Sequence, residues 1–278
     1  MDARRGCDVQ FGKAAHGGKE RQVISAMAPW SASDRRDRLA FLACLLALAC
    51  LAVLPAFASA EASSAEATRL SNERTLTTWA QSESVGGIYA HPVVGAARLA
   101  MVHLFNADGF PEVYLLLSSY VDGEGNEWVR VRVPGRPNGR TGWMLRELLG
   151  RFHHTRWRIV VERGARRMRV YYAGRLLRVF PVGVGKPSTP TPAGHFWIDE
   201  RFKLSSPSNP YWPYALGTSD YSTLPHWEGE GVVGIHGPFG EPQRIPGDPS
   251  HGCIRMLVAD IAWLGPRVTL GTPVDVIP

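Results

Sequence analysis

The chain has 278 residues, which is enough for one large domain or two modest ones. Hydrophobic residues make up 45% and charged residues 20%, as in an ordinary folded protein. Of the 31 basic and 25 acidic residues, 23 and 20 lie in residues 61–278. This small excess gives no reason to expect a nucleic-acid partner, and it suits a carboxylate-rich polymer instead.

Residues 1–60 have the pattern of an export signal. A basic segment at residues 35–38 precedes an apolar run at residues 39–54, and Ala58-Ser59-Ala60 forms a small-x-small cleavage site. We therefore expect the exported chain to begin near Glu61. Residues before Met27 lack this pattern, which makes Met27 an alternative initiator. The apolar run is also about long enough to remain as a membrane anchor.

Cysteine usage singles out one thiol. Cys7, Cys44 and Cys50 all lie within the first sixty residues, so the exported part keeps only Cys253. Exported proteins usually pair their cysteines, and a leftover thiol is a candidate for chemistry. The presence of this single cysteine is explained equally well if Cys253 is only a small hydrophobic residue in the core.

Residues 61–84 are rich in Ala, Ser, Thr and Glu, a composition that predicts a linker. Residues 85–150 predict a small all-β module, with strand candidates at Arg98–Leu104, Val113–Val121 and Glu127–Val133. Short strands followed by Thr141-Gly142-Trp143 resemble bacterial SH3-like domains. Binding of peptide or cell wall, and simple packing against the next domain, both remain open. We expect this module to fold independently.

Residues 151–278 predict a second, mostly β domain. The strand candidates are Arg158–Glu162 and Met168–Tyr172, which suggest a hairpin, and Leu176–Val184, His195–Phe202, Val232–Ile235, Val268–Leu270 and Val274–Ile277. One helix is expected at Leu257–Leu264, because its apolar residues fall on one face. Gly265 and Pro266 end it. The segment Pro210–Tyr214 is aromatic, and it either lines a substrate groove or packs under a loop.

The segment from His236 to Cys253 carries the candidate chemistry. It contains four Gly and four Pro within 18 residues, which excludes a regular helix. A cysteine nucleophile needs a nearby base, since the thiolate is the reactive form. His236 and His251 are both candidates. Gly252 between His251 and Cys253 permits close approach of a substrate, and the N–H groups of Gly252 and Cys253 could form an oxyanion hole.

The same segment resembles the L,D-transpeptidase (YkuD-type) catalytic domains. The resemblance rests on Ile235-His236-Gly237, on the string Ser250-His251-Gly252-Cys253-Ile254-Arg255, and on Thr189-Pro190-Thr191-Pro192 upstream. It runs over roughly residues 156–278. It implies a β-rich catalytic fold with one or two short helices. It implies no metal and no organic cofactor, and the spacing of the histidines around Cys253 matches no compact zinc signature.

The resemblance also implies roles for individual residues. Cys253 would attack a tetrapeptide stem of peptidoglycan, release D-alanine and pass the acyl group to an amine of a second stem, which gives a 3→3 crosslink. His236 would be the general base, oriented by the Gly237 carbonyl. Ser250, His251 and Gly252 would shape the site. Arg255 would stabilise the loop or bind a substrate carboxylate.

The acceptor is not determined by these residues. Water would make the protein an L,D-carboxypeptidase, and a protein amine would make it an enzyme that attaches proteins to peptidoglycan. The resemblance implies that carbapenem-type β-lactams acylate Cys253 in either case. A non-catalytic wall-binding protein is the alternative of a different class, and the intact His236 and Cys253 argue against it.

Overall fold

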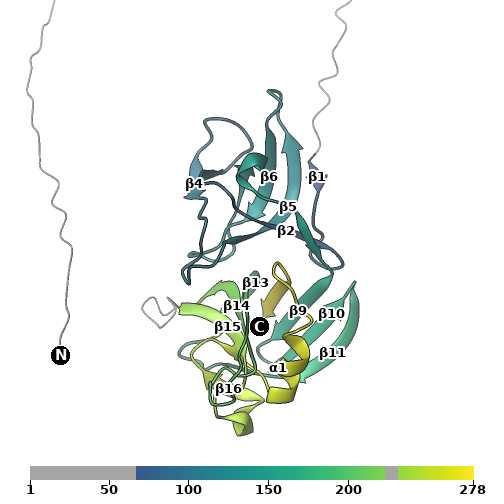
Figure 1. Ribbon diagram of the computed structural model, residues 1–278, viewed down its shortest axis with the longest axis vertical. Coiled ribbons are helices and arrows are strands. Elements are labelled where there is room, and N and C mark those ends of the chain that lie inside the picture. The colour runs from purple at the N-terminus through teal and green to yellow at the C-terminus, as the bar shows by residue number, and fades with distance from the viewer. Residues whose placement is uncertain (1–66, 223–230) are drawn as a thin grey trace, which may run out of the picture. The chain divides into compact units, whose positions relative to one another are not determined.

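The computed structural model describes residues 67–222 and 231–278. The expected export signal of residues 1–60 lies outside them. The described part of the chain is mostly β, as expected, and belongs to one compact unit of residues 62–278. It contains two sheets, drawn in Figure 1 with strands β1–β8 in one and strands β9–β18 in the other. Within residues 67–222 and 231–278, no helix is long and apolar enough to cross a bilayer.

The first sheet has the order β4-β3-β7-β6-β5-β2-β8, and β1 pairs with β5. Its elements are β1 (Thr68–Arg69), β2 (Thr77–Gln81), β3 (Gly87–Tyr89), β4 (Arg98–Met101), β5 (Val113–Val121), β6 (Glu127–Arg132), β7 (Thr141–Leu145), the 3-10 helix η1 (Arg146–Leu148) and β8 (His153–Thr155). In β6, Val129 and Val131 enter the core of this sheet while Arg130 stays exposed. Val129 and Val131 therefore lie on one side of this predicted strand and Arg130 on the other.

The boundaries of this first sheet differ from the expected 85–150. The predicted linker, residues 61–84, includes β1 and β2 in its described part, and β2 lies between β5 and β8. The composition of β2 is polar, yet Thr77 and Thr78 are buried. The hydroxyl of Thr78 donates to the Leu70 carbonyl at 2.7 Å, so the polar group is satisfied without solvent. At the other end, β8 belongs to the first sheet and not to the domain expected from residue 151.

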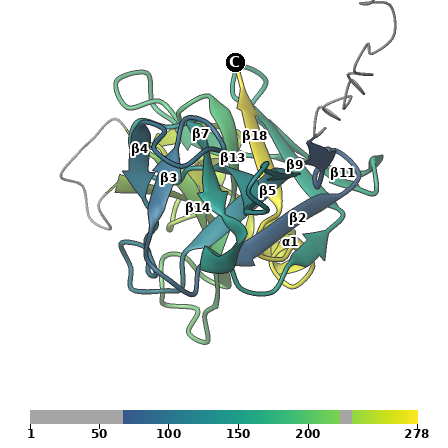
Figure 2. The same cartoon turned by 90° about the horizontal axis from the view of Figure 1, so that it is seen from above.

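The second sheet has the order β11-β10-β9-β18-β13-β14-β15-β17-β12-β16. Its elements are β9 (Trp157–Glu162), β10 (Arg167–Tyr172), β11 (Arg175–Pro181), β12 (Gly183–Gly185), β13 (Gly194–Lys203), β14 (Tyr214–Tyr221), β15 (Val232–His236), the 3-10 helix η3 (Pro242–Arg244), β16 (Gly247–Ser250), β17 (Ile254–Arg255), α1 (Val258–Leu264) and β18 (Pro273–Ile277). The predicted helix and the β9–β10 hairpin are confirmed. Strand β18 runs parallel to β9, beside it in Figure 2.

One expectation for the second sheet is wrong, and one of its strands was not predicted. Val268–Leu270 is not a strand, because the Val268 N–H continues the turn after α1 by donating to the Leu264 carbonyl. Val268 is buried in the core all the same. Strand β14 was not expected, since its sequence mixes small, polar and aromatic residues. Its neighbours β13 and β15 bury it on both sides, and this burial favours a strand that local propensity does not.

A small apolar cluster joins the two sheets. Val113 and Leu115 of β5 pack with Trp197 of β13, and the Trp197 indole N–H donates to the Val113 carbonyl at 2.9 Å. The independent folding of residues 85–150 stays a prediction. On separation either part would lose this hydrogen bond and this apolar contact, together with further hydrogen bonds such as that from Asn138 to Asp220.

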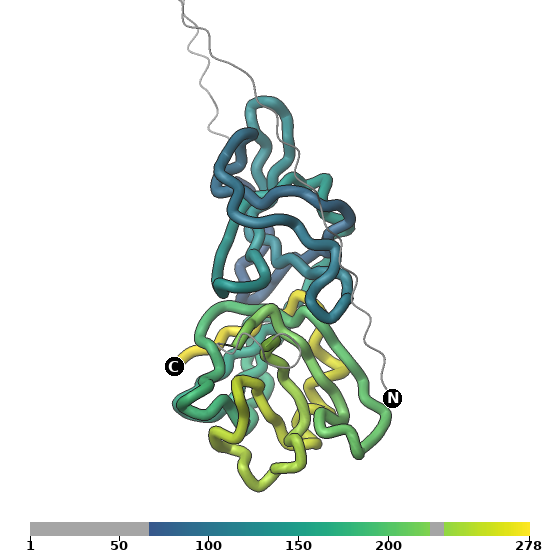
Figure 3. Tube along the Cα trace, turned by 90° about the vertical axis from the view of Figure 1, so that its left-hand side faces the viewer, coloured from purple at the N-terminus to yellow at the C-terminus, as the bar shows by residue number. Residues whose placement is uncertain are grey.

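The pairing of β17 with its neighbours positions the segment that carries Cys253. Strand β17 pairs in parallel with β15 and antiparallel with β12, so the segment between β16 and β17 lies at the ends of three strands. Figure 3 traces this yellow-green part of the chain from β15 through its loops to α1. Cys253 is the residue immediately before β17.

Candidate active site

The pairing of β15 with β17 places His236 and Cys253 on one face. Ile235 lies opposite Ile254, and both enter the core. Because successive side chains of a strand point to opposite faces, the flanking residues on both strands point away from the core. His236 and Cys253 are therefore diagonal neighbours on adjacent strands. This arrangement brings together two residues separated by 17 positions of chain.

Gly234 provides the space between the two side chains. Its N–H points at the Cys253 sulfur, with an N···Sγ distance of 3.4 Å. A Cβ at this position would lie 3.8 Å from Cδ2 of His236. The Cδ2–Nε2 edge of the imidazole therefore faces Gly234, the residue whose N–H contacts the Cys253 sulfur.

The imidazole of His236 is held by its neighbour's backbone. Nδ1 lies 2.8 Å from the carbonyl oxygen of Gly237, so Nδ1 carries the proton and Nε2 is left as the acceptor. The ring is 3% exposed, and this burial lowers its pKa to about 4, against the opposing effect of the Gly237 hydrogen bond. The positive charge of Arg255 lowers it further. His236 is therefore neutral at pH 7, with a free lone pair on Nε2.

Cys253 needs such a base. Burial raises the pKa of its thiol above the ordinary value, while the Gly234 N–H and the charge of Arg255 oppose that rise. At neutral pH the group is thus a thiol, and its reactive form requires proton removal.

Aromatic rings cover the imidazole. The ring of Tyr211 makes an edge contact with His236 at a centroid distance of 4.6 Å, and Phe239 lies 6.0 Å away. The Gly237 N–H donates to the Tyr211 carbonyl. The aromatic segment Pro210–Tyr214 thus contributes Tyr211 to the site, beside the segment that holds His236.

Gly237 fits because it has no side chain, and this yields a prediction. A Cβ at position 237 would overlap the carbonyl oxygen of Trp212, a backbone atom that cannot rotate away. We expect Gly237→Ala to lower the free energy of unfolding by about 1–3 kcal/mol, the usual scale of overpacking. Urea denaturation measures this. Gly123→Ala is the control, since nothing lies within 4 Å of that position, and an equal loss in both variants would contradict the argument.

The turn from Ser250 to Cys253 is fixed by its first residue. The Ser250 hydroxyl donates to the Cys253 carbonyl at 2.5 Å and accepts from the Gly252 N–H at 3.1 Å. In this structure the Gly252 N–H is therefore engaged by Ser250, and its expected part in an oxyanion hole stays a prediction. The N–H of Cys253 is the other donor that was predicted for the oxyanion hole.

The upstream motif with Thr189-Pro190-Thr191-Pro192 supports the same turn. The Thr191 hydroxyl is fully buried, donates to the Gly252 carbonyl at 2.7 Å, and accepts from the Gly185 N–H at 2.9 Å. It ties β12 to the turn that carries Cys253. This motif therefore positions the turn without lining the cavity.

His251 has a partner that the sequence did not reveal. Its Nε2 lies 2.9 Å from the Lys186 Nζ, 65 residues away in the chain. The ammonium donates this bond, so Nε2 is the acceptor and the ring is neutral. Partial burial lowers the pKa of His251, and the charges of Lys186 and Arg255 lower it further.

This pair gives a second prediction. We expect Lys186→Met to raise the pKa of His251, because a positive charge and a donor to Nε2 are both removed. An NMR titration of the imidazole measures it. Lys203→Met, which changes an exposed lysine on β13, should leave the His251 pKa where it is. A His251 pKa unchanged in Lys186→Met would refute the pairing.

Arg255 fastens the loop after His236. Its guanidinium bonds the Glu241 carboxylate and lies 4.8 Å from the centroid of the Phe239 ring. Of the two roles expected for Arg255, loop stabilisation has these contacts behind it. Its Nε is buried and has no hydrogen-bond partner among the described residues.

All the predicted site residues meet at one cavity of about 200 Å³. It is lined by His236, Ser250, His251, Gly252, Cys253 and Arg255, and Gly237 holds the His236 ring from behind. The rest of the wall consists of Tyr211, Ser222, Gly231, Val232, Val233 and Phe239. Within residues 67–222 and 231–278, no group of three or more His, Cys, Asp or Glu side chains could hold a metal ion.

The sequence of residues 156–276 matches the family YkuD, the L,D-transpeptidase catalytic domain. Residues 156–276 belong to this family. The YkuD domain thus coincides with the second sheet, β9–β18, and carries the whole cavity around Cys253.

Two relatives and one solved structure show the extent of the similarity. The L,D-transpeptidase-like protein YkuD of Bacillus licheniformis is 36% identical over 44% of this chain and 66% of its own. L,D-transpeptidase 1 of Mycobacterium tuberculosis is 33% identical over 37% of this chain and 43% of its own length. Among solved structures, L,D-transpeptidase 3 from Mycobacterium tuberculosis with a faropenem-derived adduct is 13% identical to this chain. The match covers 72% of this chain and 95% of that protein, with a TM-score of 0.39. The chain spans less than two thirds of either curated relative.

Three residues near the YkuD cavity make contacts that the sequence did not indicate. Lys186 and Thr191 lie within the matched upstream motif region, but nothing local shows that they contact the Cys253 turn. Asp220 is buried next to the site, and its pKa is raised to about 8 by burial. Its Oδ1 accepts from Asn138, in the loop between β6 and β7, at 2.7 Å, a contact that no sequence signal indicates.

Proposed function

We propose that this chain is a peptidoglycan L,D-transpeptidase with Cys253 as its nucleophile. The observation that supports the proposal best is the neutral, buried His236, fixed by Gly237 with Nε2 free on the face that carries the thiol. A thiol whose pKa is raised needs such a base, and a base whose pKa is lowered stays unprotonated at pH 7.

The proposed reaction has two steps. The Cys253 sulfur attacks the carbonyl of the third stem residue while its proton passes to Nε2 of His236. The C–N bond to D-alanine then breaks, and the same proton leaves on the amine of D-alanine. An amine of a second stem attacks the thioester, which forms the 3→3 crosslink and returns a proton to Cys253. Each step conserves atoms and needs no cofactor.

One assay tests the proposal and separates its alternatives. The protein is incubated with a disaccharide-free tetrapeptide stem, first alone and then with an excess of a stem that can only accept. D-alanine and crosslinked dimer are quantified by mass spectrometry. Dimer formation supports the transpeptidase, and free tripeptide without dimer supports the L,D-carboxypeptidase. Absence of D-alanine release under all conditions would contradict both.

β-Lactams are proposed ligands of the same thiol. The Mycobacterium tuberculosis structure named above carries a faropenem-derived adduct. We propose that carbapenem-type compounds acylate Cys253 in this chain. Protein-to-peptidoglycan attachment would use the same acyl-enzyme and a protein amine as acceptor.

The export of the protein is also a proposal. The arrangement of basic segment, apolar run and Ala58-Ser59-Ala60 supports cleavage near Glu61, and peptidoglycan stems lie outside the cytoplasm. N-terminal sequencing of protein from the cell envelope tests this. A chain that still starts before Leu39 in the membrane fraction would show an anchor instead.

A further inference from the structure

Strand β14 ends at the wall of the cavity around Cys253. Its last residue is Tyr221, and the next residue, Ser222, lines that cavity. The Ser222 hydroxyl lies 3.5 Å from the carbonyl oxygen of His251. A Cβ at Gly252 would lie 3.5 Å from the same hydroxyl. The end of β14 therefore lies directly against the turn that carries Cys253.

One edge of β14 loses its neighbouring strand close to Tyr221. In the antiparallel pair with β15, Tyr221 lies opposite Val232. Because the Ser222 N–H donates to the Gly231 carbonyl at 2.7 Å, alternation along the pair turns the N–H and C=O of Tyr221 away from β15. On that other side, the pairing of β14 with β13 ends at Thr218. The backbone of Tyr221 therefore needs a partner from another part of the chain.

Asn138 is that partner, and it comes from the first sheet, in the loop between β6 and β7. Its side-chain oxygen accepts from the Tyr221 N–H at 3.4 Å, and its side-chain nitrogen donates to the Tyr221 carbonyl at 3.1 Å. The same nitrogen donates to Oδ1 of Asp220 at 2.7 Å. One amide side chain thus takes the place that a neighbouring strand would have at the end of β14.

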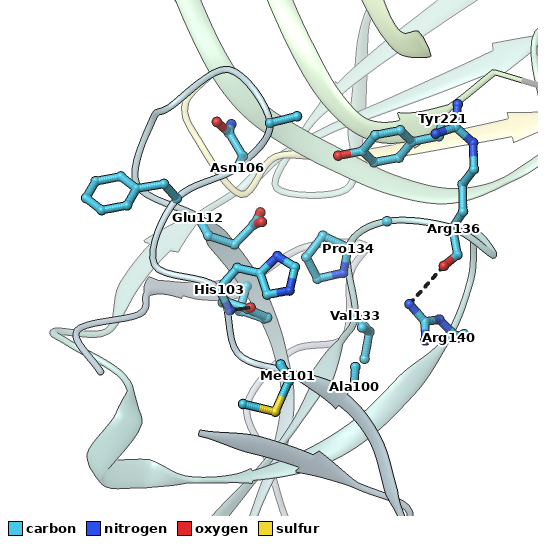
Figure 4. Close-up of a pocket in the computed structure, with 14 residues that line it drawn as sticks. Ala100, Met101, His103, Asn106, Glu112, Val133, Pro134, Arg136, Arg140 and Tyr221 are labelled. Carbon is cyan, nitrogen blue, oxygen red and sulfur yellow. Dashed lines mark hydrogen bonds between the residues drawn. The ribbon is translucent and has the colours of Figure 1, made fainter. Parts of the chain in front are cut away.

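A second residue of this loop contacts the same segment. The guanidinium carbon of Arg136 lies 4.9 Å from the centroid of the Tyr221 ring, and its Nη2 donates to the Ser222 carbonyl at 3.1 Å. Figure 4 shows Arg136 beside this ring, with the hydrogen bond from Arg140 to the Arg136 carbonyl. Arg140 also donates to the Pro137 carbonyl, so the loop is braced by its own residues. A loop held in this way can fix the strand end that it contacts.

Packing alone restrains Tyr221 only in part. The residue borders a cavity of about 380 Å³, which Figure 4 shows in close-up. Because packing contacts are missing on the cavity side, dispersion holds the residue less firmly there than in a filled core. The hydrogen bonds from Asn138 therefore supply a restraint that packing does not.

We infer that Asn138 is a positioning residue for the reaction at Cys253. By holding Tyr221 it keeps Ser222 against the turn at Gly252, and so keeps the sulfur where it can attack a carbonyl. Asn138 is not among the described residues that line the cavity around Cys253, so it acts through Ser222 and touches no substrate there. A displacement of about 1 Å at a reacting centre can cost roughly 10²-fold in rate. This role rests on the proposed function, and it gives the first sheet a part in the chemistry of the second.

Acylation kinetics of the full chain test this role. A carbapenem is mixed with the unaltered chain, with Asn138→Ala and with Asn138→Leu, and mass spectrometry of the intact protein follows the adduct. Leucine keeps about the volume of asparagine and forms no side-chain hydrogen bond. We expect both variants to acylate at least about tenfold more slowly at saturating carbapenem, while the concentration that gives half the maximal rate changes by less than about threefold. An unaltered rate in either variant would overturn the role.

Asn126→Ala is the matched control. Asn126 lies in the turn between β5 and β6, is half-buried like Asn138, and donates to the Asp122 carboxylate at 2.9 Å. The hydrogen bonds of its side chain stay within that turn. Asn126→Ala should therefore acylate as the unaltered chain does, even where urea denaturation shows a similar loss of stability in both alanine variants. Equal slowing in Asn126→Ala would assign the effect to stability and overturn the role.

Nuclear magnetic resonance separates this role from the proposed function. In proton–nitrogen correlation spectra, the amide signals of Ser222 and Gly252 should move in Asn138→Ala and stay in place in Asn126→Ala. If the unaltered chain forms no adduct while these signals move, the proposed function is wrong and the positioning by Asn138 stands. Signals that stay in place in Asn138→Ala would overturn the positioning, whatever the rate of acylation.

Discussion

Cys253→Ala should abolish both D-alanine release and β-lactam adduct formation. The nucleophile supplies the bond that the acyl-enzyme requires, and its loss commonly costs more than about 10³-fold in rate. Residual D-alanine release is expected at the background of the assay. Mass spectrometry of the intact protein after incubation with a carbapenem should show no mass increase in the variant.

Folding controls separate chemistry from stability in this variant. The thiol is uncharged in the folded state, so alanine removes one sulfur atom and no charge. Cys253→Ala and the unaltered chain should therefore have similar circular dichroism spectra and both unfold cooperatively. Turnover that survives in a folded variant would show that another group is the nucleophile, and the proposed function would then be wrong.

His236→Ala should slow acylation at pH 7 by roughly 10²–10⁴-fold, the range of general acid–base catalysis. Without Nε2 the proton of Cys253 has no acceptor, and the raised pKa of the thiol keeps the thiolate fraction small. The loss should therefore shrink as the pH rises, because Cys253 then ionises unaided. Single-turnover acylation by a carbapenem, followed from pH 6 to pH 10, measures this.

His251→Ala is the comparison for that pH profile. His251 is bound to Lys186 and lies in the turn fixed by Ser250, so its loss should slow acylation without recovery in alkali. Alkaline recovery in His251→Ala and none in His236→Ala would mean that the two histidines have the opposite roles.

The low pKa of His236 also has a consequence for stability. Its folded value of about 4 lies below the ordinary 6.5, so the unfolded chain binds the proton first as the pH falls. Stability is then lost between about pH 6.5 and pH 4, by roughly 3 kcal/mol in total for a shift of this size. In His236→Ala this part of the pH dependence should be absent. Urea denaturation at pH 7, 5.5 and 4 in both chains measures it, and an identical pH dependence would contradict the burial argument.

The sequence by itself determined the features that depend on short-range pattern. Helix α1 follows from apolar spacing and the Gly265-Pro266 stop, and β5 from its run of Val, Leu and Tyr. Cys253 follows from being the one cysteine after residue 60, in a segment too rich in Gly and Pro for a helix. His236 and Gly237 were predicted as a pair through the family resemblance, and their hydrogen bond is present.

Only the tertiary structure decided the features that depend on partners far away in the chain. Strand β2 reads as a linker, because its buried threonines are satisfied by strands that local composition cannot indicate. Strand β14 likewise forms because β13 and β15 enclose it. The protonation of His236 depends on burial by Tyr211 and its neighbours, and the state of His251 on Lys186, 65 residues away. Glu112 has an ordinary carboxyl in the sequence, and only the fold removes it from water and places Asp199 beside it. Burial and charge are properties of neighbours in space, and a sequence fixes those neighbours only once the chain has folded.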